Sequence, residues 1–144
     1  MTRHLFKLKI ILIAGLAVIF LAADTHGDSY QKERAASLHA GFLYHNGVDL
    51  VGYTVEHKLK NRLYGYYTFG IPCLAAAGIS YYSDYHHNGF AATLGVGIGS
   101  VMYSSLVYQI RIADQHFIKL GAGYTTGIAY TGIYPALSYE IRLK

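Results

Sequence analysis

The chain has 144 residues, of which 53% are hydrophobic, 15% aromatic and only 14% charged. An ordinary soluble domain carries about 25% charged residues, so this composition is unusual for a protein whose whole surface meets water. The single cysteine, Cys73, excludes an intramolecular disulfide framework.

The N-terminal residues predict an export signal. Three basic residues precede an apolar run over residues 10–23, and a polar segment follows it. This order is typical of a secretory signal peptide, and the apolar run is shorter than the roughly 20 residues that a membrane-spanning helix needs. We expect cleavage after Ala23. Cleavage after Gly27 and an uncleaved N-terminal anchor are the alternatives.

Removal of the signal peptide leaves an almost neutral chain. Of the 12 basic residues three lie in the signal, whereas all 8 acidic residues follow it, so nine basic and eight acidic residues leave about +1. The basic pI of the full chain therefore gives no support for a nucleic-acid partner. We expect a signal peptide over 1–23, a short N-terminal segment over 24–34 and one β-barrel domain over 35–144.

From residue 35 onward, every second residue is apolar through most of the chain. In residues 90–99 the apolar positions read Phe, Ala, Leu, Val and Ile, and the positions between them are mostly small. A period of two predicts a β-strand with one apolar face. The pattern, interrupted by turn residues, predicts strands over 35–45, 49–59, 63–70, 73–82, 90–99, 101–112, 116–126 and 133–143. We expect an all-β, eight-stranded, antiparallel, up-and-down barrel.

Two kinds of barrel fit this alternation. A soluble barrel would line a ligand cavity with the apolar face, whereas a transmembrane barrel would turn that face to lipid. The low charge and the small residues of the second face favour the transmembrane barrel, with its narrow lumen filled by side chains. Strand charges fall on the second face, where they could pair in the lumen or, alternatively, meet solvent: Glu56, Lys58, Arg111, Lys119, Glu140 and Arg142. Tyrosines near strand ends are expected to form interfacial girdles: Tyr44, Tyr64, Tyr81, Tyr82, Tyr130 and Tyr134.

With its signal peptide, eight alternating strands and closing stretch over residues 137–144, the chain resembles the small eight-stranded outer-membrane proteins of Gram-negative bacteria. The resemblance is one of architecture and covers the mature chain. It implies a monomeric barrel in the bacterial outer membrane. It also implies contact with membrane lipid and lipopolysaccharide, and assembly by the outer-membrane insertion machinery.

Some proteins of this architecture are lipid A deacylases, which use a His-x-Ser pair and a carboxylate. The sequence contains no His-x-Ser. The lumen-facing candidates for such a set are Ser37, His39, Glu56, Ser105, Ser138 and Glu140, and we expect them to pack the lumen. A second cluster, Asp84, His86 and His87, lies in a predicted loop and lacks a fixed third strong ligand. We therefore predict no catalytic, cofactor-binding or metal-binding residues.

The connections expected on the outer side, near residues 46–48, 70–72, 98–100 and 127–132, are all short. Adhesion and receptor roles normally depend on long outer loops, and a filled eight-stranded lumen offers no open channel. We expect a structural or interaction role in the outer membrane, without catalysis. The alternatives are a lipid A-modifying enzyme and a secreted soluble barrel that binds an apolar ligand.

Overall fold

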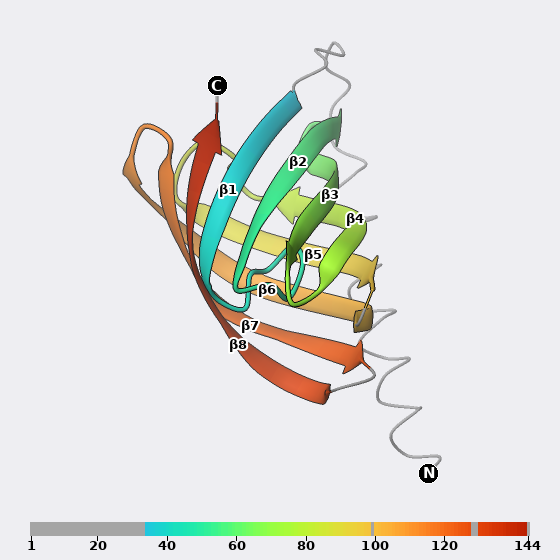
Figure 1. Cartoon of the computed structure of the whole chain (residues 1–144). Helices are drawn as coiled ribbons and strands as arrows, with labels where there is room; N and C mark the ends of the chain where they lie inside the picture. Colours follow the sequence, from blue (N-terminus) through green and yellow to red (C-terminus); the bar gives the residue numbers. More distant parts are fainter. Residues whose placement is uncertain (1–33, 99, 128–129, 144) are drawn as a thin grey trace.

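A computed structural model describes residues 34–98, 100–127 and 130–143, and these residues form a single β-sheet closed on itself (Figure 1). The predicted signal peptide and most of the N-terminal segment lie outside the described residues. The strands are β1 (Arg34–Phe42), β2 (Val51–Lys60), β3 (Leu63–Ile71), β4 (Leu74–Tyr82), β5 (Gly89–Gly97), β6 (Ser100–Ala113), β7 (His116–Gly127) and β8 (Thr131–Leu143). Among the described residues there is no helix long and apolar enough to cross a membrane.

The sheet is an antiparallel barrel in which each strand pairs with its neighbours in sequence. The barrel closes where β1 pairs with both β2 and β8, so that Ala36 lies opposite Val55 on one side and Leu143 on the other. This confirms the predicted eight-stranded, up-and-down, closed barrel. The strand bounds differ from the predicted ones by at most three residues, because alternation along each strand records the two faces of the sheet.

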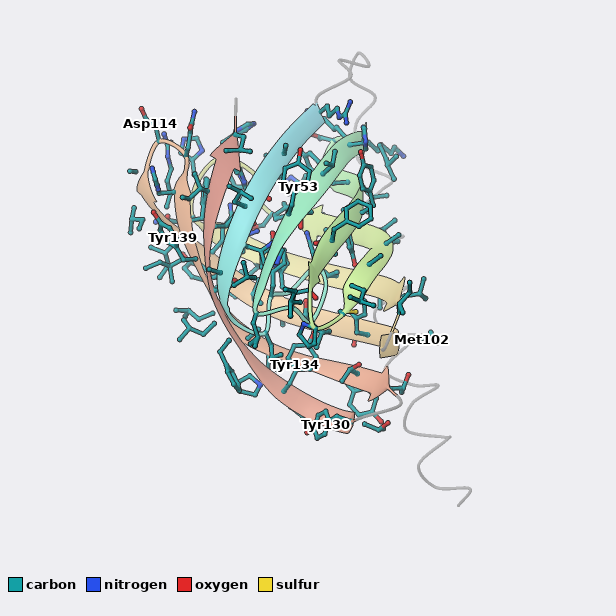
Figure 2. The ribbon with its side chains drawn as sticks, viewed as in Figure 1. Tyr53, Met102, Asp114, Tyr130, Tyr134 and Tyr139 are labelled. Atoms are coloured by element: carbon teal, nitrogen blue, oxygen red, sulfur yellow. The ribbon has the colours of Figure 1, made fainter. Side chains whose placement is uncertain are left out.

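The two ends of the barrel differ in their connections. The start of β1 and the end of β8 lie at one end, together with the connections over 61–62, 83–88 and 114–115. We call this the terminal end, and the other the opposite end. Figure 2 shows the barrel from the side, with Asp114 at the terminal end and Met102 and Tyr130 at the opposite end.

The outer surface of the barrel is apolar. Twenty-two large hydrophobic side chains of the described residues are exposed, including Ile71, Leu106 and Ile133 at 69, 58 and 73%. The other face turns inward and carries serine, threonine, glutamate, lysine and tyrosine side chains that are almost fully buried. Small inward residues make room for these long side chains. A Cβ atom on Gly95, for example, would collide with the side chains of Tyr66 and Tyr103.

The connection between β1 and β2 departs from the predicted strand. Strand β1 was expected to continue to residue 45, but it ends at Phe42, and residues 43–50 turn into the barrel. We call residues 43–50 the inner loop. Leu43 and Val48 have positive φ angles of 59° and 56°, which break the extended conformation. The connection at this position, predicted to be short, is therefore not a short exposed turn.

The prediction of the tyrosine girdles was wrong for four of its six residues. Tyr44, Tyr64, Tyr82 and Tyr134 are at most 2% exposed and lie inside the barrel. Tyr64, Tyr82 and Tyr134 belong to the inward-facing positions of their strands, whereas Tyr44 is carried inward by the inner loop. The position of a residue along a strand sets its distance from the barrel end, but whether that position is odd or even decides whether the side chain points inward or outward.

Candidate functional site

The lumen is filled by two clusters of polar side chains, each centred on a buried glutamate. The first is centred on Glu140 of β8, which is fully buried. Lys119 Nζ lies 2.6 Å from Glu140 Oε2, and Arg142 Nε lies 2.8 Å from Oε1. The hydroxyl of Tyr44 donates to Oε2 as well. A carboxylate held by two cations and a hydroxyl has partners for most of its acceptor sites, which is what burial of an ion requires.

Arg142 is held on its other sides by neutral groups. Its guanidinium donates to Gln109 Oε1 at 3.1 Å and to the backbone carbonyl of Tyr85. It also lies 3.9 Å from the centre of the Tyr85 ring and 4.0 Å from that of Phe117. These are cation–π distances, so the charge is stabilised even where no carboxylate reaches it.

The second cluster is centred on Glu56 of β2, and the groups that bond it are neutral. Oε1 accepts hydrogen bonds from the Tyr82 hydroxyl at 2.6 Å and from Asn46 Nδ2 at 3.0 Å. Oε2 accepts from the Tyr85 hydroxyl at 2.6 Å. Tyr85 enters the lumen from the connection over 83–88 at the terminal end, whereas Asn46 enters from the opposite end. The two clusters therefore connect both ends of the barrel to its centre.

The inner loop is fixed to the barrel wall by hydrogen bonds from several strands. Asn46 Oδ1 accepts from Ser80 at 2.8 Å and from Thr93 at 2.9 Å, while the Asn46 carbonyl accepts from the Tyr103 hydroxyl at 2.8 Å. Ser105 donates to the carbonyl of His45 at 3.1 Å. Because these donors come from β4, β5 and β6, the loop ties together strands that are far from β1 in the sheet.

Asp49 closes the inner loop at the opposite end. Its Oδ1 accepts the backbone N–H of Cys73 at 3.0 Å, and its Oδ2 has no hydrogen-bond partner among the described residues. Burial raises the pKa of the Asp49 carboxyl to about 6, and the hydrogen bond from Cys73 opposes this only in part. Cβ atoms on Gly47 or Gly70 would collide with Asp49, so these glycines make the space for it.

The catalytic candidates named from sequence all lie in the lumen, but they do not form a nucleophile and base. Neither ring nitrogen of His39 has a hydrogen-bond partner among the described residues, so none of these serines bonds it. The His39 ring instead stacks on Tyr44, with ring centres 3.6 Å apart. Glu140 lies opposite His39 in the β1–β8 register, yet its oxygens are bonded to Lys119, Arg142 and Tyr44. The hydrogen bonds of these residues are those of a packed core.

The cluster of Asp84, His86 and His87 is an exposed turn. Asp84 Oδ1 accepts the backbone N–H groups of His86 and His87 at 2.9 and 3.0 Å, and lies 3.3 Å from His87 Nδ1. A carboxylate that caps two backbone amides in this way shapes a loop. Within the described ranges, no group of three or more histidine, cysteine or acidic side chains is arranged to hold a metal ion.

Sequence analysis missed the inner loop and the role of Tyr85. The segment His45-Asn46-Gly47 has the composition of an exposed turn, and nothing local separates an inward turn from an outward one. One indirect signal was present. The polar face of β2 carries Glu56, and a buried carboxylate needs hydrogen-bond donors from elsewhere in the chain.

No protein-family model matches the chain, and comparisons with curated proteins and with solved structures also found no match.

Proposed function

We propose that this chain is an integral β-barrel of a bacterial outer membrane, with a structural or interaction role there. In this proposal a cleaved signal peptide exports it, the insertion machinery assembles it as a monomer, and membrane lipid and lipopolysaccharide surround it. The observation that carries the proposal is the side on which the apolar residues lie. The closed barrel turns its large hydrophobic side chains outward and buries the charges of Glu56, Lys119, Glu140 and Arg142 in its lumen, which is the arrangement that lipid favours.

The extent of the apolar surface supports this environment. Soluble monomers rarely expose a contiguous apolar patch larger than about 300–600 Å². Here exposed leucine, isoleucine, valine, phenylalanine and tyrosine side chains occur on every strand of the barrel. The soluble-barrel alternative requires the apolar face to line an inner cavity, whereas the inward face of these strands carries polar and tyrosine side chains that fill the lumen.

Tyrosine hydroxyls at the terminal end support the same environment. Tyr67, Tyr81 and Tyr139 lie on the outer face, and their hydroxyls hydrogen-bond basic side chains at strand ends: Arg34, Arg62 and His116 respectively. Tyrosine with its ring beside an apolar belt and its hydroxyl toward polar groups is typical of a membrane–water interface. In this proposal Tyr81, which the sequence predicted, forms the girdle at this end together with Tyr67 and Tyr139, which it did not.

The filled lumen supports a role other than conduction. The inner loop enters from one end and Tyr85 from the other, and between them Glu56 and Glu140 are surrounded by side-chain donors. Side chains packed in this way through the described part of the lumen argue against a porin-like function. The outer surface and the two ends are then the parts of the molecule that can interact with other molecules.

Fractionation combined with gel mobility tests the proposal. The protein should remain in the membrane fraction after carbonate washing, and its mobility should differ between unheated and boiled samples, because a folded barrel resists detergent unfolding. Recovery in the soluble periplasm without detergent would contradict the proposal, and so would identical mobility before and after boiling.

A further inference from the structure

Charged side chains are distributed unevenly between the ends of the barrel. Of the charged residues that the structure describes, Glu56, Lys119, Glu140 and Arg142 are in the lumen, and Asp49 is buried at the opposite end. The remaining ones all lie at the terminal end: Arg34, Lys58, Lys60, Arg62, Asp84, Arg111 and Asp114. Five of these seven are basic, so the terminal end carries an excess of three positive charges among the described residues.

Three of the basic residues lie at neighbouring strand ends on the rim of the terminal end. Arg34 begins β1, Lys60 ends β2 and Arg62 lies in the connection to β3, and all three are exposed. We call these three residues the basic patch. Strands β1, β2 and β3 are neighbours in the sheet, as Figure 1 also shows, so the patch covers one sector of the barrel rim.

The acidic side chains described at this end are engaged elsewhere. Asp114 forms an ion pair with Arg111 at 2.7 Å on the β6–β7 connection. Asp84 caps the backbone amides of His86 and His87. Both lie outside the sector of the basic patch, so the positive charge of the patch is not cancelled by them.

Hydrogen bonds place the basic patch at the level of the tyrosine girdle. Arg34 donates to the Tyr67 hydroxyl at 3.3 Å, and Arg62 lies 3.5 Å from the Tyr81 hydroxyl. Each guanidinium has five N–H donors, so a bond to one neutral hydroxyl leaves donors for a further acceptor. Guanidinium groups match the geometry of phosphate oxygens and bind them through paired hydrogen bonds.

We propose that the basic patch binds the phosphate groups of anionic glycerophospholipids in the leaflet around the terminal end. This inference rests on the proposed membrane function. Because both chain ends of an even-stranded barrel lie on the same side, expected to be the periplasm, this is the inner leaflet of the outer membrane. A basic side chain close to an anionic lipid surface strengthens binding about fivefold, so three give at most about a hundredfold.

The test compares lipids on the purified barrel in neutral detergent by native mass spectrometry. Phosphatidylglycerol should bind at least about tenfold more tightly than phosphatidylcholine, and 0.5 M salt should reduce the difference because it screens exposed charges. Equal binding of the two lipids to the unchanged protein would overturn the inference. Glycerol phosphate in solution that binds as tightly as phosphatidylglycerol would also overturn it, because the patch would then be a site for free anions. Lipid A that binds more tightly than phosphatidylglycerol would overturn it too, because the patch would then lie in the other leaflet.

Variants separate this patch from the other charged side chains at the same end. The triple variant Arg34→Gln, Lys60→Gln, Arg62→Gln should lose the preference for phosphatidylglycerol. The control Arg111→Gln, Asp114→Asn removes a paired charge at the same end and should retain it; loss in the control as well would overturn the assignment. If the triple variant does not fold, the single variant Arg34→Gln should show a preference for phosphatidylglycerol about fivefold smaller than that of the unchanged protein.

A second readout distinguishes failure of this inference from failure of the proposed function. Refolding into vesicles of phosphatidylcholine alone, followed by heat-modifiable mobility, tests membrane insertion without any anionic lipid. Insertion without a preference for phosphatidylglycerol would overturn only the inference that the basic patch binds anionic lipid. Failure to insert into any vesicle would overturn the membrane function and this inference with it.

Discussion

The two buried glutamates allow one substitution to be compared in two electrostatic settings. Glu140→Gln removes the charge that compensates both Lys119 at 2.6 Å and Arg142 at 2.8 Å. It leaves two buried cations without their direct counter-ion, a change that typically costs about 3–5 kcal/mol. Part of the cost is offset for Arg142, whose guanidinium keeps the contact with the Phe117 ring at 4.0 Å.

Glu56→Gln makes the same chemical change at the other glutamate, and we expect it to cost less stability. The groups bonded to Glu56 are the neutral donors Tyr82, Asn46 and Tyr85. A glutamine carbonyl can still accept from some of them, so the loss is that of a charge-assisted bond replaced by a neutral one, about 1–2 kcal/mol. Glu140→Gln should therefore destabilise the barrel by about 2 kcal/mol more than Glu56→Gln.

Urea unfolding of the refolded protein in vesicles, followed by gel mobility and circular dichroism, measures both variants. Because the substitution is the same, effects on hydration of the unfolded chain cancel in the comparison. The combined variant Lys119→Met, Glu140→Gln supplies a control, since removing both partners should restore part of the lost stability. A cost for Glu56→Gln equal to or above that for Glu140→Gln would refute the assignment of the two clusters.

Three further predictions concern the inner loop, the lumen and the outer face. The folded state raises the pKa of Asp49 from 3.8 to about 6, so ionisation of this carboxyl opposes folding. The stability that Asp49 contributes should therefore fall as pH rises from about 4 to 6. Urea unfolding of Asp49→Asn should lack this part of the pH dependence. Gly95→Val should cost about 1–3 kcal/mol in urea unfolding, since two tyrosines occupy the space of a side chain there, whereas Ala77→Val on the exposed face should cost little; equal costs would contradict the assigned faces. Leu137→Arg, in the middle of β8, should impair insertion into vesicles by about 2–4 kcal/mol, and full insertion of this variant would show that the position does not face lipid.

The barrel could be predicted from sequence because each strand shows a two-residue alternation of apolar side chains. Each strand alternates between a face that meets the surroundings and a face that meets the lumen, and this alternation needs no knowledge of other strands. The eight strands and the inward position of Glu56 and Glu140 followed from it. The pairing of Ala36 with both Val55 and Leu143, which closes the barrel, follows only from the three-dimensional register.

The inner loop could not be predicted, because its position depends on space created by distant residues. Tyr44 continues the alternation of β1 after Phe42, so local pattern placed it on the outer face. In the structure the chain turns at Leu43, and the lumen accepts the inner loop because Gly52 leaves room for His39, on which Tyr44 stacks, and Gly70 leaves room for Asp49. Such space is a property of the assembled barrel, and no stretch of β1 contains it.

The bonding within the lumen was equally beyond sequence analysis. Parity placed His39, Glu56 and Glu140 on the inner face but could not give their partners. Whether His39 bonds a serine or stacks on Tyr44 depends on the course of the inner loop, which decides where the tyrosine ring lies. The candidate catalytic residues were thus located correctly, and their hydrogen-bond arrangement became visible only in the structure.

Spin-label accessibility at Leu106 measures whether the apolar face meets lipid. A label is attached at Leu106→Cys in a Cys73→Ala background, with Asp114→Cys as the control, because Leu106 is exposed in the middle of β6 and the Asp114 side chain is 93% exposed at the terminal end. In vesicles, the label at position 106 should collide often with oxygen, which dissolves in lipid, and rarely with a water-soluble nickel chelate, and the label at 114 should show the reverse. Equal access of the nickel chelate to both positions would contradict a barrel whose outer face lies in the membrane.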